Sequence, residues 1–128
     1  MPDIAVSFKG PFFEPGLPED AVNDAMRATI GELVAEGETD VKLQLYRGHG
    51  LLTGHYRNSV HGEVLNSRHG AVHDSRVIYG AWLEGTSSRN QTTRFKGYFM
   101  FRLAARRLQQ KAQGIANKHF ARAASRMN

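Results

Sequence analysis

The chain has 128 residues, of which 41% are hydrophobic and 23% are charged, and it contains no cysteine. This length and composition predict one globular domain over residues 1–128 and exclude wholesale disorder and collagen-like repeats. The absence of cysteine excludes a disulfide framework, a thiolate metal site and a cysteine nucleophile. The apolar stretches are shorter than the roughly 20 residues of a membrane helix. Met1-Pro2-Asp3 lacks the features of a signal peptide, so we expect a soluble protein made in a cytoplasm, with no membrane partner.

The distribution of charge along the chain is more informative than its sum of +5. Residues 1–40 carry two bases and nine acids, whereas residues 41–128 carry fifteen bases and three acids. Such a split favours either a polyanionic partner or an assembly in which the acidic face of one copy meets the basic face of another. A simple solvated surface is the alternative interpretation.

The first elements are a strand and a helix. Ile4, Val6 and Phe8 alternate with less apolar residues, which predicts a short strand. A helix is expected to begin at Pro18, which suits the first helical position, and residues 19–20 supply acids at the positive end of the helix dipole. Its apolar stripe at helical spacing is formed by Val22, Ala25, Met26, Thr29, Ile30, Leu33 and Val34.

The end of this helix is ambiguous in the sequence. Gly37 is expected to end or kink it. Val41, Leu43 and Leu45 then alternate like a strand, yet residues 39–40, Thr-Asp, resemble a helix cap. We favour a second helical piece that runs to about Arg47.

The middle of the chain has the pattern of antiparallel strands. After a Gly-His-Gly loop at 48–50, residues 60–64 alternate and predict a strand. Residues 66–70 are typical of a hairpin turn whose glycine takes a positive φ, and residues 71–73 return as the second strand. Residues 76–79 are a candidate third strand.

A long basic helix ends the chain. Residues 85–93 are small and polar and are expected to be mobile, and the helix should run from about Tyr98 to Arg126. The order of helix, hairpin and helix predicts an α+β fold with a central antiparallel sheet. One side of the last helix is apolar, with Phe101, Ala104, Ala105, Leu108, Ala112, Ile115, His119 and Phe120. The other side is basic, and its candidates for contact with a DNA channel or a neighbouring subunit are Arg102, Arg106, Arg107, Lys111, Lys118 and Arg122.

Signatures of enzyme chemistry are few. The chain has no nucleophile elbow, phosphate loop or dinucleotide fingerprint, so we expect no catalytic site and no cofactor. Five histidines fall between residues 49 and 73, and His61 and His73 are placed to face each other across the hairpin. Their spacing does not match a zinc pattern, so no metal is expected, and a histidine-dependent metalloenzyme is kept only as a third hypothesis. The other alternative is a small DNA-binding protein that uses the last helix, with aromatics at 98–101 either stacking on bases or packing in the core.

Three segments resemble, in order, the "gene product ten-like" family of tailed-phage neck and tail-completion proteins, which are head–tail connectors. The first is 53–60, Thr-Gly-His-Tyr-Arg-Asn-Ser-Val, and the second is 79–86, Tyr-Gly-Ala-Trp-Leu-Glu-Gly-Thr. The third is the pair Arg94-Phe95 that leads into the terminal helix. The residues that carry the resemblance, all expected to maintain the fold, are Thr53, Gly54, Arg57, Ser59, Tyr79, Trp82, Glu84, Gly85, Thr86 and Phe95.

The resemblance implies a structural virion protein at the head–tail junction, either neck, connector or tail terminator, without enzymatic activity. Such proteins form homo-oligomeric rings, here expected to be sixfold or twelvefold, around a channel through which the genome DNA passes without sequence readout. The implied partners are neighbouring neck rings and proteins of the portal side and the tail-tube side. The charge split agrees with a ring in which acids of residues 19–40 pair with bases of residues 89–126 on a neighbouring subunit.

The motif residues also have individual roles that physical chemistry suggests. Gly54 is expected to end a helix in the left-handed conformation, and Arg57 to begin the next strand and pair with an acid. Glu84 is the only carboxylate after Asp74, so we expect a basic partner for it. Trp82 should be largely buried, because it supplies a large apolar area.

Overall fold

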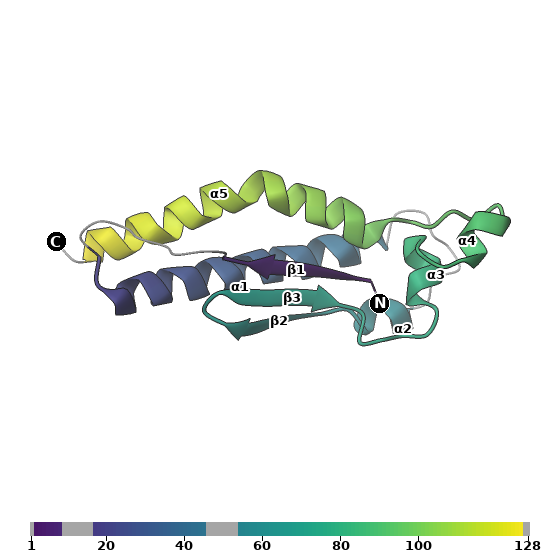
Figure 1. Cartoon of the computed structure of the whole chain (residues 1–128), viewed down its shortest axis with the longest axis horizontal. Coiled ribbons are helices and arrows are strands. Elements are labelled where there is room, and N and C mark those ends of the chain that lie inside the picture. The colour runs from purple at the N-terminus through teal and green to yellow at the C-terminus, as the bar shows by residue number, and fades with distance from the viewer. Residues whose placement is uncertain (1, 9–16, 46–53, 127–128) are drawn as a thin grey trace.

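Two long helices and a small antiparallel sheet form the molecule (Figure 1), so the expected α+β class is confirmed. The structure, a computed structural model, describes residues 2–8, 17–45 and 54–126. Within these ranges, no helix is both long and apolar enough to cross a membrane. The elements in chain order are β1 (Asp3–Ser7), α1 (Glu19–Gln44), α2 (Gly54–Asn58), β2 (His61–Asn66), β3 (His69–His73), α3 (Gly80–Glu84), α4 (Arg89–Thr92) and α5 (Met100–Arg126).

The first helix is longer than the sequence predicted, because α1 continues through Gly37 to Gln44. The interruption expected at Gly37 is therefore wrong. A Cβ at this glycine would lie 3.0 Å from both Leu108 Cδ1 and Val72 Cγ2, so the missing side chain lets α5 and the sheet approach α1 closely. All seven residues of the predicted apolar stripe are buried, and Pro18 is the N-cap rather than the first helical residue.

Helical rather than strand periodicity holds at the end of α1, as we favoured. Val41 and Leu45 are buried, whereas Leu43 between them is 52% exposed. A spacing of four residues returns a side chain to the same face of a helix, and a spacing of two does not. Arg47 and the loop at 48–50 lie outside the described residues.

The sheet has the strand order β1-β3-β2, and both pairings are antiparallel. The predicted hairpin is confirmed, but its turn is residues 67–68, and Gly70 lies within β3 instead of supplying a positive φ. A Cβ on Gly70 would lie 2.6 Å from Val34 Cγ2 and 2.7 Å from Ile30 Cγ2, so this glycine serves close packing of β3 on α1.

The third strand is β1, so the strand expected at 76–79 is wrong. The chain turns after β3 instead, and both Ser75 and Arg76 take a φ of 60° before α3 begins at Gly80. Ile78 is 99% exposed, which shows why the apolar run misled the sequence analysis: it does not enter the core.

Asn90 organises much of the segment 85–93, which was expected to be mobile. Its Oδ1 accepts the Ser87 N–H at 2.9 Å, and its Nδ2 donates to the carbonyls of Trp82 and Phe95, each at 3.1 Å. Asn90 is only 3% exposed and lies in the short helix α4. A buried amide with three partners accounts for the turn that carries the chain from α3 to α5.

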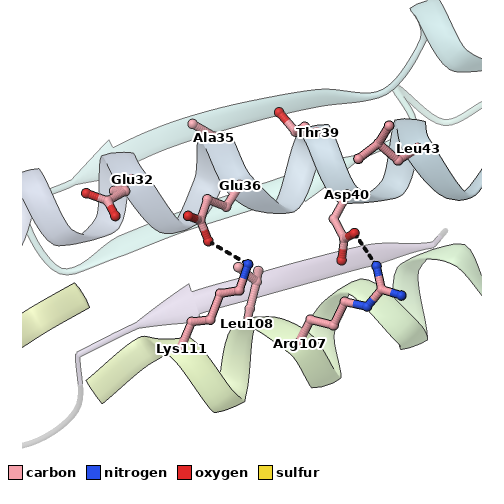
Figure 2. Close-up of a pocket in the computed structure, with 9 residues that line it drawn as sticks. All are labelled: Glu32, Ala35, Glu36, Thr39, Asp40, Leu43, Arg107, Leu108 and Lys111. Atoms are coloured by element: carbon pink, nitrogen blue, oxygen red, sulfur yellow. Dashed lines mark hydrogen bonds and ion pairs between the residues drawn. The ribbon is translucent and has the colours of Figure 1, made fainter. Parts of the chain in front are cut away.

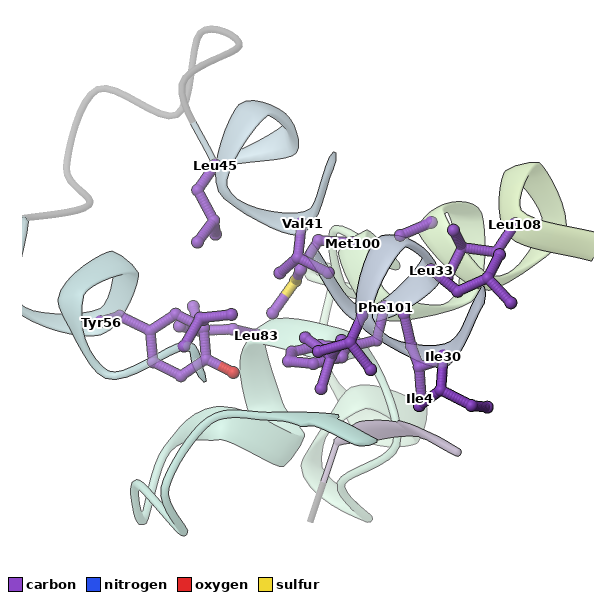
Figure 3. Packing of buried hydrophobic residues seen from close by; sticks show 14 of the residues in the cluster. Ile4, Ile30, Leu33, Val41, Leu45, Tyr56, Leu83, Met100, Phe101 and Leu108 are labelled. Carbon is purple, nitrogen blue, oxygen red and sulfur yellow. The ribbon is translucent and has the colours of Figure 1, made fainter. Parts of the chain in front are cut away.

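The core lies where α1 and α5 meet over the sheet, and Figure 3 shows side chains from both helices, β1, α2 and α3 converging there. The predicted apolar side of α5 is confirmed, since each of its eight residues is buried or partly buried. A second, smaller cluster joins the start of α1 to the end of α5 through Met26 and Phe120, against which Phe8 packs edge-on with ring centroids 6.4 Å apart.

Two glycines give opposite predictions for stability. Nothing lies within 4 Å of a Cβ added at Gly31 in α1, so Gly31→Ala should raise the free energy of unfolding by about 0.5–1 kcal/mol through helix propensity. Gly70→Ala should lower it by about 1–3 kcal/mol, because the methyl group overpacks against Ile30 and Val34. Urea denaturation of both variants measures the difference, and equal effects would contradict this packing.

Candidate functional site

The segments that resemble the phage family gather at one end of the molecule, where α2, α3 and the start of α5 meet (Figure 1). Tyr56 of α2 contacts Tyr79 before α3, with ring centroids 5.7 Å apart. Trp82 of α3 contacts Phe95 at 4.9 Å, and Phe95 in turn contacts Tyr98 at 4.9 Å. Three stretches separated in sequence therefore meet in two sets of ring contacts, Tyr56–Tyr79 and Trp82–Phe95–Tyr98, which together we call the aromatic cluster.

Beside the aromatic cluster lies a buried pair that the sequence analysis missed. The Tyr56 hydroxyl donates to Asp74 Oδ2 at 2.8 Å, and Asp74 Oδ1 accepts the Arg76 N–H at 3.0 Å. Asp74 is fully buried, and Gly80 packs so closely against it that any side chain there would collide with the carboxyl group. Burial, and then the Asp74 hydrogen bond, raise the pKa of Tyr56 well above its usual range, so it acts as a neutral donor.

Glu84 holds the start of α5 with its carboxylate. Its two oxygens accept the N–H groups of Phe101 at 2.8 Å and Arg102 at 3.1 Å. The expectation of a basic side-chain partner is therefore wrong, because the partner is the unsatisfied backbone of a helix N-terminus. Burial raises the pKa of Glu84, while the two backbone hydrogen bonds and the charge of Arg102 oppose that rise.

The first family segment differs from its predicted local structure. Gly54 begins α2 instead of ending a helix, and Arg57 lies inside α2, four residues before β2 begins. Thr53 lies outside the described residues. Ser59 closes α2 by donating from Oγ to the His55 carbonyl at 2.9 Å, and its own carbonyl accepts the Ser75 hydroxyl at 2.8 Å.

The second and third segments form the turn that leads into α5. Trp82 is partly buried rather than largely buried, because its ring packs on the outer side of the core against Phe95. Gly85 ends α3 with a φ of 104°, which a residue with a side chain rarely adopts. The N–H groups of Gly85 and Thr86 both donate to the Ala81 carbonyl, at 3.0 and 2.9 Å.

The acidic helix meets the basic helix within one chain. Asp40 Oδ1 lies 2.6 Å from Arg107 Nη1, and Lys111 Nζ lies 3.5 Å from Glu36 Oε2 (Figure 2). One turn earlier in α1, Lys118 and His119 both contact Glu32, at 2.6 and 3.0 Å. Antiparallel packing of α1 and α5 therefore gives these residues partners within one chain, and the pairing expected between neighbouring subunits stays a prediction.

The hydrogen bond from Lys118 is the main reason that the pKa of Glu32 is lowered, with smaller contributions from His119. The groove in Figure 2 has a volume of about 340 Å³ and is crossed by these pairs. Among its charged lining residues, Asp40 pairs with Arg107 and Glu36 with Lys111, whereas Glu32 pairs with Lys118 and His119 outside the lining. Exposed pairs of this kind contribute about 0–1 kcal/mol each, so they fix the register of the helices more than they stabilise the fold.

The other predicted contact residues of α5 remain at the surface. Arg102 lies over the Phe99 ring, 5.6 Å from its centroid. Arg106 and Arg122 are exposed and have no ion pair among the described residues. Phe101 is 2% exposed, so at this position core packing is confirmed and base stacking is excluded.

The histidines of the hairpin do not converge. His61 and His73 are opposite each other in the β2–β3 register, as expected. His73 Nε2 lies 3.1 Å from Glu63, and its Nδ1 accepts the Ser75 N–H at 3.0 Å. Among the described residues, no group of three or more histidine or acidic side chains is arranged to hold a metal ion, and His49 lies outside them.

Comparison of the chain with models of known protein families, with curated proteins and with solved structures finds no match.

The Tyr56–Asp74 pair yields a test of the buried network. Tyr56→Phe should lower the free energy of unfolding by about 1–3 kcal/mol, because it leaves a buried carboxyl oxygen without its donor. Tyr79→Phe removes the hydroxyl of a neighbouring ring that is 41% exposed and should change stability by less than about 0.5 kcal/mol. Denaturation curves of the two variants measure the contrast, and equal losses would show that the hydroxyl of Tyr56 has no special partner.

Glu84 gives a prediction about pH. Its raised pKa means that the folded chain binds this proton more tightly than the unfolded chain, where the ordinary value is 4.5. The resulting stability is fully present below about pH 4.5 and is lost as the pH rises through the raised pKa. The unfolding free energy of the wild type should therefore fall relative to that of Glu84→Gln as the pH is raised above 4.5. Parallel denaturation series measure this, and a pH-independent difference would contradict it.

Proposed function

We propose that this chain is a structural protein of a tailed-phage virion that forms a ring at the head–tail junction, as neck, connector or tail terminator, around the DNA channel. It acts by assembly and not by catalysis. Its partners are copies of itself, in a sixfold or twelvefold ring, and the proteins of the portal side and the tail-tube side.

The convergence of the three family segments is the observation that carries this proposal. Residues 53–60, 79–86 and 94–95 are distant in sequence, yet their described parts meet in the aromatic cluster and at the Glu84 cap. A chance likeness in three short motifs gives no reason for them to meet in space. Their meeting supports a common architecture, since these contacts set the direction of α5.

The surface charge of the second half of the chain also supports the proposal. Asp74 and Glu84 are the only acids after Glu63, and both are buried with hydrogen-bond partners. The exposed charges that follow Asp74 are therefore all positive, and they include Arg76, Arg89, Arg94, Lys96, Arg102, Arg106 and Arg122. Diffuse positive charge attracts DNA without reading its sequence, which suits a channel through which DNA slides.

The same charges favour the second candidate, a small DNA-binding protein. Arg107, Lys111 and Lys118 are held in intrachain pairs, so binding would rely on the other α5 cations and on the α4 region. Isolated chains would then bind free duplex DNA with an affinity that falls steeply with salt. A ring protein needs little affinity for DNA as a monomer.

Assembly is the direct test of the proposed function. The purified chain, alone and together with portal-side and tail-tube proteins of the same phage, should form closed rings visible by negative-stain electron microscopy. Rings supported by these partners, with weak DNA binding by the monomer, are the expected result. A chain that stays monomeric with all partners and binds DNA tightly would replace the ring proposal with the DNA-binding one.

Charge reversal separates the free cations from the paired ones. Arg94→Glu with Arg106→Glu changes two exposed side chains that have no ion pair with any described residue, so it should leave stability within about 0.5 kcal/mol while it impairs assembly or genome retention. Lys111→Glu places two acids together at Glu36 and should instead destabilise the monomer. Thermal melts and virion infectivity measure the two effects. Full infectivity of the double variant would show that the basic face is only a solvated surface.

A further inference from the structure

Both outer strands of the sheet have an edge with no strand beside it among the described residues, because the order is β1-β3-β2. The Phe8 N–H donates to the Arg68 carbonyl at 2.8 Å, which continues the β1–β3 ladder one residue beyond the Ser7–His69 pair. In an antiparallel ladder, alternate residues face the partner strand. Because the backbone N–H of Phe8 points toward β3, the backbone N–H and C=O groups of Val6 and Ile4 also point toward β3. The backbone N–H and C=O groups of Ala5 therefore point away from β3, toward the free edge of β1.

On β2, a hydrogen bond to a side chain shows which backbone groups point away from β3. The Gly62 N–H donates to Glu38 Oε1 of α1 at 3.3 Å, so Gly62 points away from β3. Val64, two residues later, points the same way. The two assignments are consistent on β3, where Val72 faces β1 and its neighbours face β2.

A groove lies beside the free edge of β1. It has a volume of about 240 Å³, runs between β1 and α5, and is mostly apolar. Val6 of β1 and Ala105 and Ala112 of α5 line it, and all three are partly buried. The residues that line it are Ile4, Ala5, Val6, Ser7, Leu33, Ala105, Leu108, Gln109 and Ala112.

We infer that this groove and edge receive the β2 strand of a second copy of the chain, which adds to β1 as a parallel strand. The inference rests on the proposed function, since it names the contact by which copies join. In a parallel ladder, one residue bonds to the two residues that flank its partner. With Ala5 of one copy beside Glu63 of the other, the Ala5 N–H donates to the Gly62 carbonyl, and the Val64 N–H donates to the Ala5 carbonyl.

The side chains fit this register. Val64 is 41% exposed and shares its sheet row with Val6, on the face that packs against the helices, so pairing places it in the apolar groove. On the other face, Asp3 and His61 are both aligned with His73, so pairing places a carboxylate beside an imidazole. The Gly62 N–H that Glu38 occupies is not one of the two groups required of β2.

The proposed contact uses two different surfaces, the β1 edge with its groove and the β2 edge. A contact between unlike surfaces repeats from copy to copy, and it closes into a ring when the rotation permits. The alternative of two β2 edges pairing with each other would instead give a symmetric dimer.

Two variants each block one surface, and their test is the oligomeric state by analytical ultracentrifugation. Val64→Lys brings a charge into the apolar groove, and Ala5→Pro removes an N–H that faces solvent in the monomer, a position where edge strands tolerate proline. Each should weaken self-association more than about tenfold, a loss of about 1.4 kcal/mol or more in association free energy. Ile78→Lys is the matched control, because it makes a similar change at a fully exposed site away from both edges.

Mixing the two variants gives the sharpest result. Each keeps one intact surface, so Val64→Lys and Ala5→Pro should each remain monomeric alone but form a one-to-one dimer when mixed, and no larger species. Circular dichroism of each variant alone establishes that its fold is retained. For a variant that does not fold, slower hydrogen exchange of the Ala5 and Val64 amides in the wild-type assembly than in the wild-type monomer is the equivalent measurement.

Three outcomes would overturn the inference. Wild-type rings together with unchanged association of both folded variants would leave the ring proposal standing and reject this contact. Dimers of Ala5→Pro alone would show symmetric β2 pairing. A wild-type chain that is monomeric at every concentration and with every neck partner would reject both the contact and the proposed function.

Discussion

The buried carboxylate of Glu84 is the interaction on which the rest of the molecule depends. It accepts two backbone N–H groups in the first turn of α5 and so joins the end of α3 to α5. A helix N-terminus carries unsatisfied N–H donors and a positive partial charge. A carboxylate accepts hydrogen bonds from the donors, and its negative charge is attracted to the partial charge. The placement of α5 against α1 follows from this join. The α1–α5 ion pairs and the groove beside β1 depend on the same placement.

Close approach of backbones is the second constraint, and glycine makes it possible at two kinds of position. Gly37 lets α1 lie against α5 and the sheet, and Gly70 lets β3 lie against α1. Gly80 gives the Asp74 carboxyl group the space it occupies beside Tyr56.

The charge split is partly resolved inside the fold and partly left at its surface. Three acids of α1 meet bases of α5, so the opposition seen along the sequence first serves antiparallel packing of the two helices. Among the described residues, the exposed Arg94, Arg106 and Arg122 lie outside these pairs and are available for a partner. In an assembly held together by strand edges, the subunit contacts would not use these cations, which agrees with the proposed role towards DNA.

The sequence by itself determined the α+β class, the apolar stripes of both long helices and the hairpin, because these depend on periodicity, and periodicity is a local property. It also singled out Tyr79, Trp82 and Glu84 as residues that hold the fold. Tertiary structure decided what local patterns could not. Gly37 continues a helix because α5 and the sheet pack against it, and Ile78 stays exposed because no element covers it. Phe101 lies 17 residues from Glu84, Tyr56 lies 18 residues from Asp74, and Lys118 lies 86 residues from Glu32, so only the folded chain could bring these partners together.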